Sequence, residues 1–546
     1  MMAGTNKLLK IDIGGKQGYI FSCNKLKAVV GASWVMGNKV FEPLEEIAIS
    51  HPGLSKVYEG GGNALYQYNN ETDIEKIITQ YSSKIIKYFP GIQLEFGMAL
   101  NDTSKSWKDR SHTLNKDLIK NKNQNYTECR PYKTGIAADC PFSGEAQEES
   151  YQPSDNEPVQ WISKEVKVKI GAAKASNNDF QRKVGDVFHI PLEIDEIGDD
   201  DDKSYVAVVH IDGNGLGSKF MNCTDLSCTE CKKEVKDVSS NTTCLSCLSR
   251  LVKHKLESSM NYLVEKVIIP LFDKKGAFDH NNDDSEIRLK KISRTKDDNN
   301  AHKAILPFRP IINAGDDITF ICHGRLGIYL AEEYIKILND ESIGGLSIPS
   351  CGGVAIVHTK YPFYRAYELA EKLAGEAKIK SRPQSKCTDI TSIVEEIIPE
   401  KEQKKNSCWL NFMVAPQGYT GDFKKMLENK YPTRHSRQHG PYLVIDNARD
   451  DIPKATISMQ TLKQKLQSTV YNTDEKKAWP KNKLMELRAN LFKSKADIEY
   501  FMEVMKSRKL VDDKEAKGFT NFPYVDLADM LHFYPEPLLD KKITKK

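Results

Sequence analysis

The sequence has little net charge and no long apolar run, and both absences exclude classes of protein. Its 546 residues include 79 Lys and Arg against 75 Asp and Glu, a formal net charge of +4. This near balance does not support sequence-independent binding of long nucleic acids, which usually accompanies a strong basic excess. No apolar stretch approaches the roughly 18 residues of a membrane span, and the N-terminal residues lack the apolar core and cleavage site of a signal peptide. We therefore expect a cytoplasmic protein that binds no membrane.

Two common catalytic motifs are missing as well. The sequence has no GxxxxGKS/T loop, and its 12 His show no zincin-like spacing, so we expect neither a P-loop ATPase nor a zincin. A hydrophobic share of 39% is sufficient to build cores and excludes wholesale disorder. The length suggests about three or four domains.

Two stretches of the chain repeat one order of strand-like and helix-like segments. The strand-like segments lie within 8–21, 57–68 and 92–100 in the first stretch, and within 204–211, 308–323 and 350–358 in the second. The main helix-like segments are about 24–38, 73–88, 248–267, 325–338 and 366–377. This βαββαβ order, present twice, predicts an α+β fold with two ferredoxin-like domains.

The expected domain boundaries follow this repeat. The acidic run at 199–202 indicates a solvated linker, and Lys-rich helical spacing beyond about residue 456 indicates a helical C-terminal domain. The expected segments are a first ferredoxin-like domain at 1–140, a linker or irregular segment at 141–203, a second domain at 204–385 with an insertion at 221–250, and a mainly helical domain at 386–546.

Three carboxylates mark the second stretch. Asp212 ends its first strand, in VVHIDGNGLG, and Asp316 and Asp317 occupy the turn of its central hairpin, in INAGDDITF. Because these strands are neighbours in a βαββαβ sheet, we expect the carboxylates to meet at one edge. Oxygen ligands in this number suit two Mg²⁺ or Mn²⁺ ions, which also hold substrate phosphates. The alternative is a pair of ordinary polar turns, but the joint placement favours a metal-nucleotide site.

Small and polar residues beside these carboxylates are candidate nucleotide contacts. Gly213, Asn214 and Gly215 follow Asp212, and their glycines leave room for a triphosphate to approach backbone N–H groups. Gly315 allows the hairpin turn a positive φ. Ser218 is a candidate contact to ribose or phosphate, with an ordinary loop serine as the alternative.

A cysteine array predicts a structural zinc site. Two C-x2-C pairs separated by 12 residues bring four thiolates into tetrahedral reach of one Zn²⁺, with no open position for chemistry. The expected ligands are Cys228, Cys231, Cys244 and Cys247. We expect Cys223 to be a bystander; the role of Cys129 and Cys140 stays open.

Several motifs together resemble one family. HIDGNGLG, AGDD and CGGVAIVHTKYPFYRAYELAEKLAGEAK are similar to the second palm domain of the CRISPR polymerase-cyclase family, the large subunits of type III CRISPR effectors and their stand-alone relatives. KIDIGGKQGYIFSCNKLKAVVGAS and EGGGNALYQY resemble the family's first palm domain. The resemblance spans roughly residues 8–380, but Ala314 replaces the first Gly of the family's GGDD turn.

The resemblance implies an activity. Such enzymes join ATP molecules into cyclic oligoadenylates or related cyclic nucleotides in antiviral defence, with attack of a ribose hydroxyl on an α-phosphate and release of pyrophosphate. Lys378 matches the family's Ala-Lys and is expected to pair with a triphosphate, with a solvated lysine at a helix C-terminus as the alternative. ATP or another NTP is the expected substrate, and guide or target RNA and other type III CRISPR subunits are candidate partners.

The first palm-like stretch is expected to be catalytically silent. Where the second stretch has its acidic turn, the first has Glu59, three glycines and Asn63, although Asp12 remains on its first strand. One carboxylate beside an amide does not readily hold two divalent ions. We expect this stretch to be structural or to hold a second nucleotide.

Three further expectations follow from the resemblance. None of the 12 His precedes an Asp, so the His-Asp nuclease found in many large subunits is not expected. An RNA-binding scaffold subunit with an inactive palm is the main alternative function. A diguanylate-cyclase-like enzyme that uses GTP is a weaker one.

Overall fold

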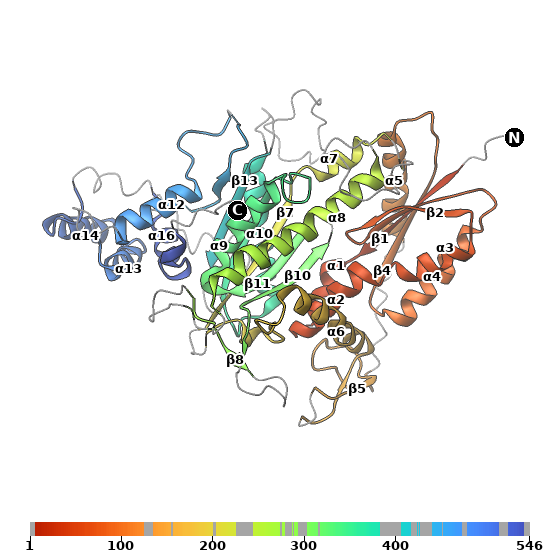
Figure 1. Ribbon diagram of the computed structural model, residues 1–546, viewed down its shortest axis with the longest axis horizontal. Coiled ribbons are helices and arrows are strands. Elements are labelled where there is room, and N and C mark those ends of the chain that lie inside the picture. The colour runs from red at the N-terminus through yellow and green to blue at the C-terminus, as the bar shows by residue number, and fades with distance from the viewer. Residues whose placement is uncertain are drawn as a thin grey trace.

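The computed structural model in Figure 1 has two sheet-containing parts in a row and a group of helices beyond the second. The first sheet and its helices lie towards one end of the long axis, and the C-terminal helices lie at the other. The structure describes residues 6–23, 25–124, 135–153, 157–199, 204–224, 226, 244–273, 276–278, 287, 289–292, 303–314, 317–382, 406–415, 423, 425, 439–449, 451–471, 478–512 and 522–539.

The first part is built on a four-stranded antiparallel sheet. Its strands are β1 (Lys7–Gly14), β2 (Leu54–Gly60), β3 (Asn63–Tyr68) and β4 (Gln93–Leu100), in the spatial order β2-β3-β1-β4. Its helices are α1 (Lys16–Phe21), α2 (Leu26–Asn38), α3 (Glu42–Ser50), α4 (Ile74–Tyr88) and α5 (Trp107–Gln124). The expected strands and the two expected helices of this stretch are confirmed, and α1, α3 and α5 are additions to them.

Helices cover both faces of the first sheet. On one face, the ring of Tyr81 from α4 meets the ring of Phe96 edge-on, with 6.4 Å between their centroids. Successive strand residues point to opposite faces, and the next residue, Gly97, faces α5. A Cβ on Gly97 would come within 2.8 Å of the Leu118 Cβ.

The second part is built on a six-stranded sheet. Its strands are β7 (Tyr205–Gly213), β10 (Phe308–Ala314), β11 (Asp317–His323), β12 (Ser350–His358), β13 (Cys408–Val414) and β14 (Tyr442–Ile445), in the order β10-β11-β7-β12-β13-β14. Its helices are α7 (Leu216–Met221), α8 (Leu245–Tyr262), α9 (Gly327–Asn339) and α10 (Phe363–Ser381). The first four strands in chain order occupy the same relative places as the four strands of the first sheet.

The second sheet also has a helix layer on each face, and glycines allow the close approach. A Cβ on Gly327 of α9 would come within 2.3 Å of the Ala207 Cβ on β7. On the opposite face, a Cβ on Gly353 of β12 would come within 2.0 Å of the backbone oxygen of Ala370 on α10. Thus α9 and α10 sandwich the sheet, and α10 lies on the face that carries Asp212.

The segment expected to be an irregular linker contains a long helix. The helix α6 (Lys164–Val184) begins at Ser163, whose hydroxyl accepts a hydrogen bond from the Val166 amide, and it packs closely against α2. Gly31 of α2 lies so close to α6 that a Cβ there would overlap the Lys169 carbonyl. The prediction of an irregular segment at 141–203 was wrong here. The apolar residues of α6 form only a narrow stripe among many polar residues, so the helical pattern is weak in the sequence. Two short strands, β5 (Glu149–Tyr151) and β6 (Gln160–Ile162), precede α6.

The expected boundary at residue 385 is also wrong. The strand β13 lies parallel to β12 and β14 follows it, so the C-terminal segment adds two strands to the second sheet. Beyond them, the expected helices are present: α12 (Met459–Leu466), α13 (Lys481–Asn490), α14 (Lys495–Ser507) and α16 (Tyr524–Phe533). The buried Lys463 of α12 donates a 2.7 Å hydrogen bond to Glu332 of α9, which joins these helices to the sheet layer.

The remaining short elements lie between these units. They are β8 (Lys291–Ile292), β9 (Lys303–Ala304), and the short 3₁₀ or π segments Ile194–Glu196, Leu263–Ile268, Ile269–Leu271, Gly324–Leu326, Gln467–Tyr471 and Glu536–Leu538. Within the part of the chain that the structure describes, each helix is too short or too polar to cross a bilayer.

Candidate active site

Two of the expected carboxylates face each other across neighbouring strands. Asp212 near the end of β7 is in register with Asp317 at the start of β11, and on its other side it is in register with Cys351 of β12. Directly opposite residues share a face, with their Cβ atoms roughly 4.5–5.5 Å apart. Two like charges at this separation destabilise the sheet unless a cation lies between or beside them.

A lysine from α10 supplies one positive charge to this pair. The Lys378 Nζ lies 2.5 Å from Asp212 Oδ2, and the two side chains are 31% and 21% exposed. The end of α10 that carries this lysine is fixed from outside the helix. Arg449 donates hydrogen bonds to the Ser381 carbonyl and to the Ser407 hydroxyl, and it pairs with Asp451 at 2.7 Å.

A buried histidine lies beneath the acidic pair on the same face. His210, two residues before Asp212, shares a 3.0 Å hydrogen bond with the Thr319 hydroxyl and meets the ring of Tyr367 edge-on. Burial lowers the pKa of His210 to about 4, so the ring is neutral at physiological pH. Burial raises the pKa of Tyr367, and the neighbouring Glu371 and Asp317 carboxylates raise it further. The floor of the site is therefore uncharged.

The glycine loop after Asp212 turns away from the sheet edge. Asn214 is buried: its backbone N–H donates to the Pro349 carbonyl at 2.7 Å, and its amide nitrogen donates to Cys351 Sγ at 3.1 Å. Gly215 has φ near +79°, which a non-glycine residue rarely adopts, and it begins α7. Ser218 is exposed on α7. The Asn214 side chain thus points into the protein, whereas Ser218 is open to solvent.

The donor set suits hard divalent cations. Gly315 and Asp316 lie outside the described residues, and within the described ones no three His, Cys, Asp or Glu side chains gather closely enough to hold a metal ion. The two described carboxylates, however, are partly exposed and share a face. Carboxylate oxygens in such a place fit Mg²⁺ or Mn²⁺.

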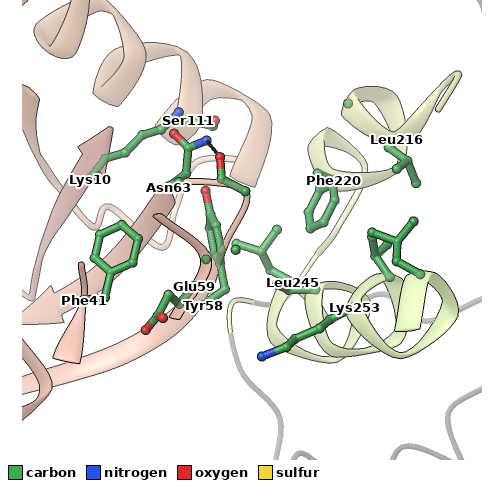
Figure 2. Close-up of a pocket in the computed structure, with 18 of the residues that line it drawn as sticks. Lys10, Phe41, Tyr58, Glu59, Asn63, Ser111, Leu216, Phe220, Leu245 and Lys253 are labelled. Carbon is green, nitrogen blue, oxygen red and sulfur yellow. Dashed lines mark hydrogen bonds between the residues drawn. The ribbon is translucent and has the colours of Figure 1, made fainter. Parts of the chain in front are cut away.

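A cavity lies beside this loop, between the two parts of the molecule. It encloses about 420 Å³, and Figure 2 shows Tyr58, Glu59 and Phe41 of the first part facing Phe220 and Lys253 of the second. The rings of Tyr58 and Phe220 are 6.3 Å apart. Burial, followed by the Asp12 charge, raises the pKa of Tyr58 to about 12. The Tyr58 side of the wall is therefore aromatic with a neutral hydroxyl, and Glu59 and Lys253 are ionisable residues beside it.

The glycine loop connects the acidic edge with this cavity. Leu216 and Gly217, which follow the loop directly, line the cavity, and the glycine turn Gly60–Gly62 of the first part lines its other side. Trp107 of α5 donates a 3.0 Å hydrogen bond to the Phe220 carbonyl and ties the two walls together. The cavity lining does not include Asp212, Asp317 or Lys378, so the loop is the link between the cavity and the acidic edge.

The matching edge of the first sheet has a different charge balance. Asp12 of β1 is in register with Asn63 of β3 and Glu95 of β4. Lys16 pairs with Asp12 at 3.2 Å, and the Asn63 amide, oriented to satisfy both neighbours, donates to Asp12 at 2.7 Å and accepts from Lys16 at 3.3 Å. The central aspartate of this sheet is thus already neutralised by a lysine and an amide.

Half of the expected zinc ligands lie in the described residues. Cys244 and Cys247 are buried at the start of α8, one turn apart, and Cys223 is buried nearby. Cys228 and Cys231 lie outside the described residues, as does Cys129. Cys140 is buried in a small apolar cluster that also contains Cys23.

Sequence reasoning missed several residues of this site. Cys351 and Tyr367 contact it from β12 and α10, and Gln17 of α1 donates a 2.6 Å hydrogen bond to Glu371 of α10, which brings the first part against the helix that carries Lys378. Of the missed residues, only His210 had a signal: it is a polar residue in an apolar strand, two positions before Asp212 and therefore on the same face.

Comparisons with known proteins identify the fold. A scan against protein-family models found no match, and a search of curated proteins found none either. A chain of the Csm1–Csm4 cassette solved in complex with AMPPNP is similar, with a TM-score of 0.52 and 12% identity over 98% of this chain and 69% of that chain. A chain of the apo Csm1–Csm4 cassette is similar with a TM-score of 0.50 and 12% identity, over 98% and 70%. At this identity the likeness establishes a shared fold.

Proposed function

We propose that this protein is a metal-dependent nucleotidyltransferase of the CRISPR polymerase-cyclase family, and that it makes cyclic oligoadenylate or a related cyclic nucleotide from ATP. The observation that carries the proposal is the register of Asp212 with Asp317 on a partly exposed face of the second sheet. The resemblance of the HIDGNGLG and AGDD motifs to the family supports it. So does the fold shared with a cassette chain that was solved with an ATP analogue.

In this proposal the two sheets are the two palm domains, and the second is the active one. Asp212, Asp316 and Asp317 hold two Mg²⁺ or Mn²⁺ ions. When bound, these ions supply Lewis acidity to the attacking hydroxyl and to the leaving pyrophosphate. Lys378 binds a phosphate oxygen as a point charge, and the backbone of Gly213–Gly215 lies along the triphosphate.

The cavity gives the nucleotide a place for its base. Its wall includes the rings of Phe41, Tyr58 and Phe220, which offer a stacking surface for a purine. Because residues of both parts line it, the first palm acts as a wall of the binding site and positions a second nucleotide against the first. The hydroxyl of one nucleotide is thereby held near the α-phosphate of the other.

The cysteine array has a structural role in this proposal. Zn²⁺ held by Cys228, Cys231, Cys244 and Cys247 fixes the start of α8, the helix whose residues line the cavity. Removal of zinc with a chelator is therefore expected to weaken nucleotide binding by loosening this wall.

One experiment tests the activity directly. The purified chain is incubated with each NTP and Mg²⁺ or Mn²⁺, and the products are read by mass spectrometry. We expect a cyclic product and pyrophosphate from ATP, and none from the double variant Asp316→Ala with Asp317→Ala. If the double variant retains its fold by circular dichroism and still turns over ATP at the parent rate, the active-site assignment is wrong. A cyclic product from GTP alone instead favours the diguanylate-cyclase-like alternative.

The second candidate function is a scaffold subunit of a type III CRISPR effector. The fold shared with a chain of a two-protein cassette favours a role that includes partner subunits. A scaffold is expected to copurify with guide RNA and smaller subunits and to form no product with any NTP. The register of Asp212 with Asp317, in motifs that resemble the family's acidic turn, favours the enzyme.

A further inference from the structure

The contact between Lys378 and Asp212 occupies a carboxylate that the proposed reaction needs for a metal ion. The lysine Nζ lies 2.5 Å from Asp212 Oδ2, so this oxygen is engaged by an ammonium group. A divalent cation that coordinates the same oxygen at about 2.1 Å leaves no room for the ammonium, and the two positive charges repel each other. Metal and lysine therefore compete for Asp212.

The first sheet contains the same kind of lysine–aspartate pair. Lys16 lies 3.2 Å from Asp12, and the residue opposite this aspartate is the amide Asn63. On its other side, Asp12 is in register with Glu95 of β4. In the second sheet the residue in the same place as Asn63 is an acid, Asp317, rather than an amide.

The lysine is free to change partners without a movement of its helix. Arg449 anchors the last turn of α10 through the Ser381 carbonyl and the Ser407 hydroxyl. The Lys378 ammonium stands on a flexible chain of four methylenes and is 31% exposed. A rotation of this side chain carries the ammonium from Asp212 towards the open side of the site.

We propose, resting on the proposed function, that Lys378 is a resident counter-ion: it neutralises Asp212 in the metal-free protein, is displaced when the divalent cation binds, and then binds the nucleotide's phosphates. Removal of the lysine is expected to have opposite effects on the two ligands. The metal ion gains a free carboxylate, whereas the nucleotide loses a positive charge. A lysine that only binds phosphate, or only stabilises the fold, does not produce this pair of opposite effects.

The test measures Mn²⁺ binding to the full chain without nucleotide, by the electron paramagnetic resonance of free Mn²⁺. We expect Lys378→Gln to tighten Mn²⁺ binding by roughly twofold to fivefold, the range that an ion pair of this exposure allows. The matched control is Lys16→Gln in the first sheet, which is expected to leave Mn²⁺ affinity unchanged. In the presence of saturating Mn²⁺, Lys378→Gln is expected to weaken ATP binding.

The outcomes separate this inference from the proposed function. If the parent chain binds no Mn²⁺, or if Asp212→Asn and Asp317→Asn leave its Mn²⁺ binding unchanged, the metal site is wrong. The proposed function is then wrong as well. If the parent binds Mn²⁺ in that way but Lys378→Gln binds it no more tightly, the counter-ion inference alone is wrong. A thermal melt of each variant shows whether it is folded, and Lys378→Arg, which keeps the charge, serves as the second variant and is expected to retain the parent's Mn²⁺ affinity.

Discussion

The two sheets carry the same strand order, and they differ most at the end of the central strand. In the first sheet, Asp12 faces an amide and pairs with a lysine of the next helix; in the second, Asp212 faces another acid and pairs with a lysine that comes from α10. Asp12 also lies in register with Glu95, so both sheets place a second acid beside the central aspartate; they differ in the strand that supplies it and in the amide that bridges Asp12 to Lys16. One strand order thus carries two arrangements, in which the residue on the neighbouring hairpin strand is an amide in the first sheet and an acid in the second.

The largest expected effect is on activity and separates the two aspartates. Asp212→Asn is expected to lower the rate of ATP turnover on the order of a thousandfold, because it removes a charge that the proposed site uses in the transition state. Asp12→Asn is the matched variant and is expected to change the rate far less. The measurement is pyrophosphate release at saturating ATP and Mn²⁺. Equal losses in the two variants would contradict the assignment of chemistry to the second sheet.

Two equivalent glycines allow the helix packing of the two sheets to be compared. Gly353 is in register with His210 and Gly97 with Lys10, so the two glycines occupy equivalent places under α10 and α5. Gly353→Ala is expected to destabilise the protein by about 3 kcal/mol, because the added Cβ would lie within 2.0 Å of the Ala370 carbonyl oxygen. At Gly97 the nearest atoms, the Leu118 Cβ and the Leu114 carbonyl oxygen, are 2.8 and 2.9 Å from the added Cβ, so we expect Gly97→Ala to cost less, about 2 kcal/mol.

The measurement for this glycine pair is urea unfolding. Displacement of α10 also moves Lys378, so Gly353→Ala is expected to alter Mn²⁺ affinity and Gly97→Ala is not. A larger destabilisation at Gly97 would show that α5, rather than α10, is the more tightly packed helix.

Acid is expected to destabilise the second sheet through its buried histidine. Burial lowers the pKa of His210 from 6.5 to about 4, so the unfolded chain takes up a proton below pH 6.5 while the folded chain does not. Its contribution to stability is full above pH 6.5 and is lost as the pH falls towards 4, by up to about 3 kcal/mol. The His210→Gln variant is expected to lose less stability than the parent between about pH 7 and about pH 4.5 in urea unfolding.

The equivalent residue of the first sheet provides the control. Burial lowers the pKa of Lys10 from 10.5, so its own effect on stability arises above neutral pH. Lys10→Met is therefore expected to keep the parent's sensitivity to acid. An unchanged acid sensitivity in His210→Gln would mean that other groups dominate the response.

The smallest expected effect comes from converting the first edge into the second. Asn63→Asp places an acid opposite Asp12 and removes the amide that bridges Asp12 and Lys16. We expect a loss of about 1 kcal/mol in stability, from the like charges now facing each other. Thermal melts measure it, and added Mn²⁺ is expected to restore part of the loss. A variant as stable as the parent without Mn²⁺ would show that Lys16 alone balances two acids.

The elements of both sheets were predictable because their signals are local. Runs of β-branched residues such as those of β7 indicate strands, and a hairpin fixes its own register, so the meeting of β7 and β11 at Asp212 and Asp317 followed from the strand order. The unpredicted features depend on contacts between segments far apart in the chain. The packing of α6 on α2 and the contact of Lys378 with Asp212 each join distant segments, and no residue spacing in the sequence indicates either contact.

The anchoring of α10 has a consequence for anyone who seeks a minimal fragment of this protein. Arg449, far downstream of the helix, orients its final turn, and β13 lies parallel to β12 beneath it. A chain that ends at residue 385 would keep all the acidic residues of the site. It would lose Arg449, which holds the last turn of α10 and so orients Lys378. Truncation at this point is therefore expected to weaken nucleotide binding at the proposed site as well as to remove two strands from the second sheet.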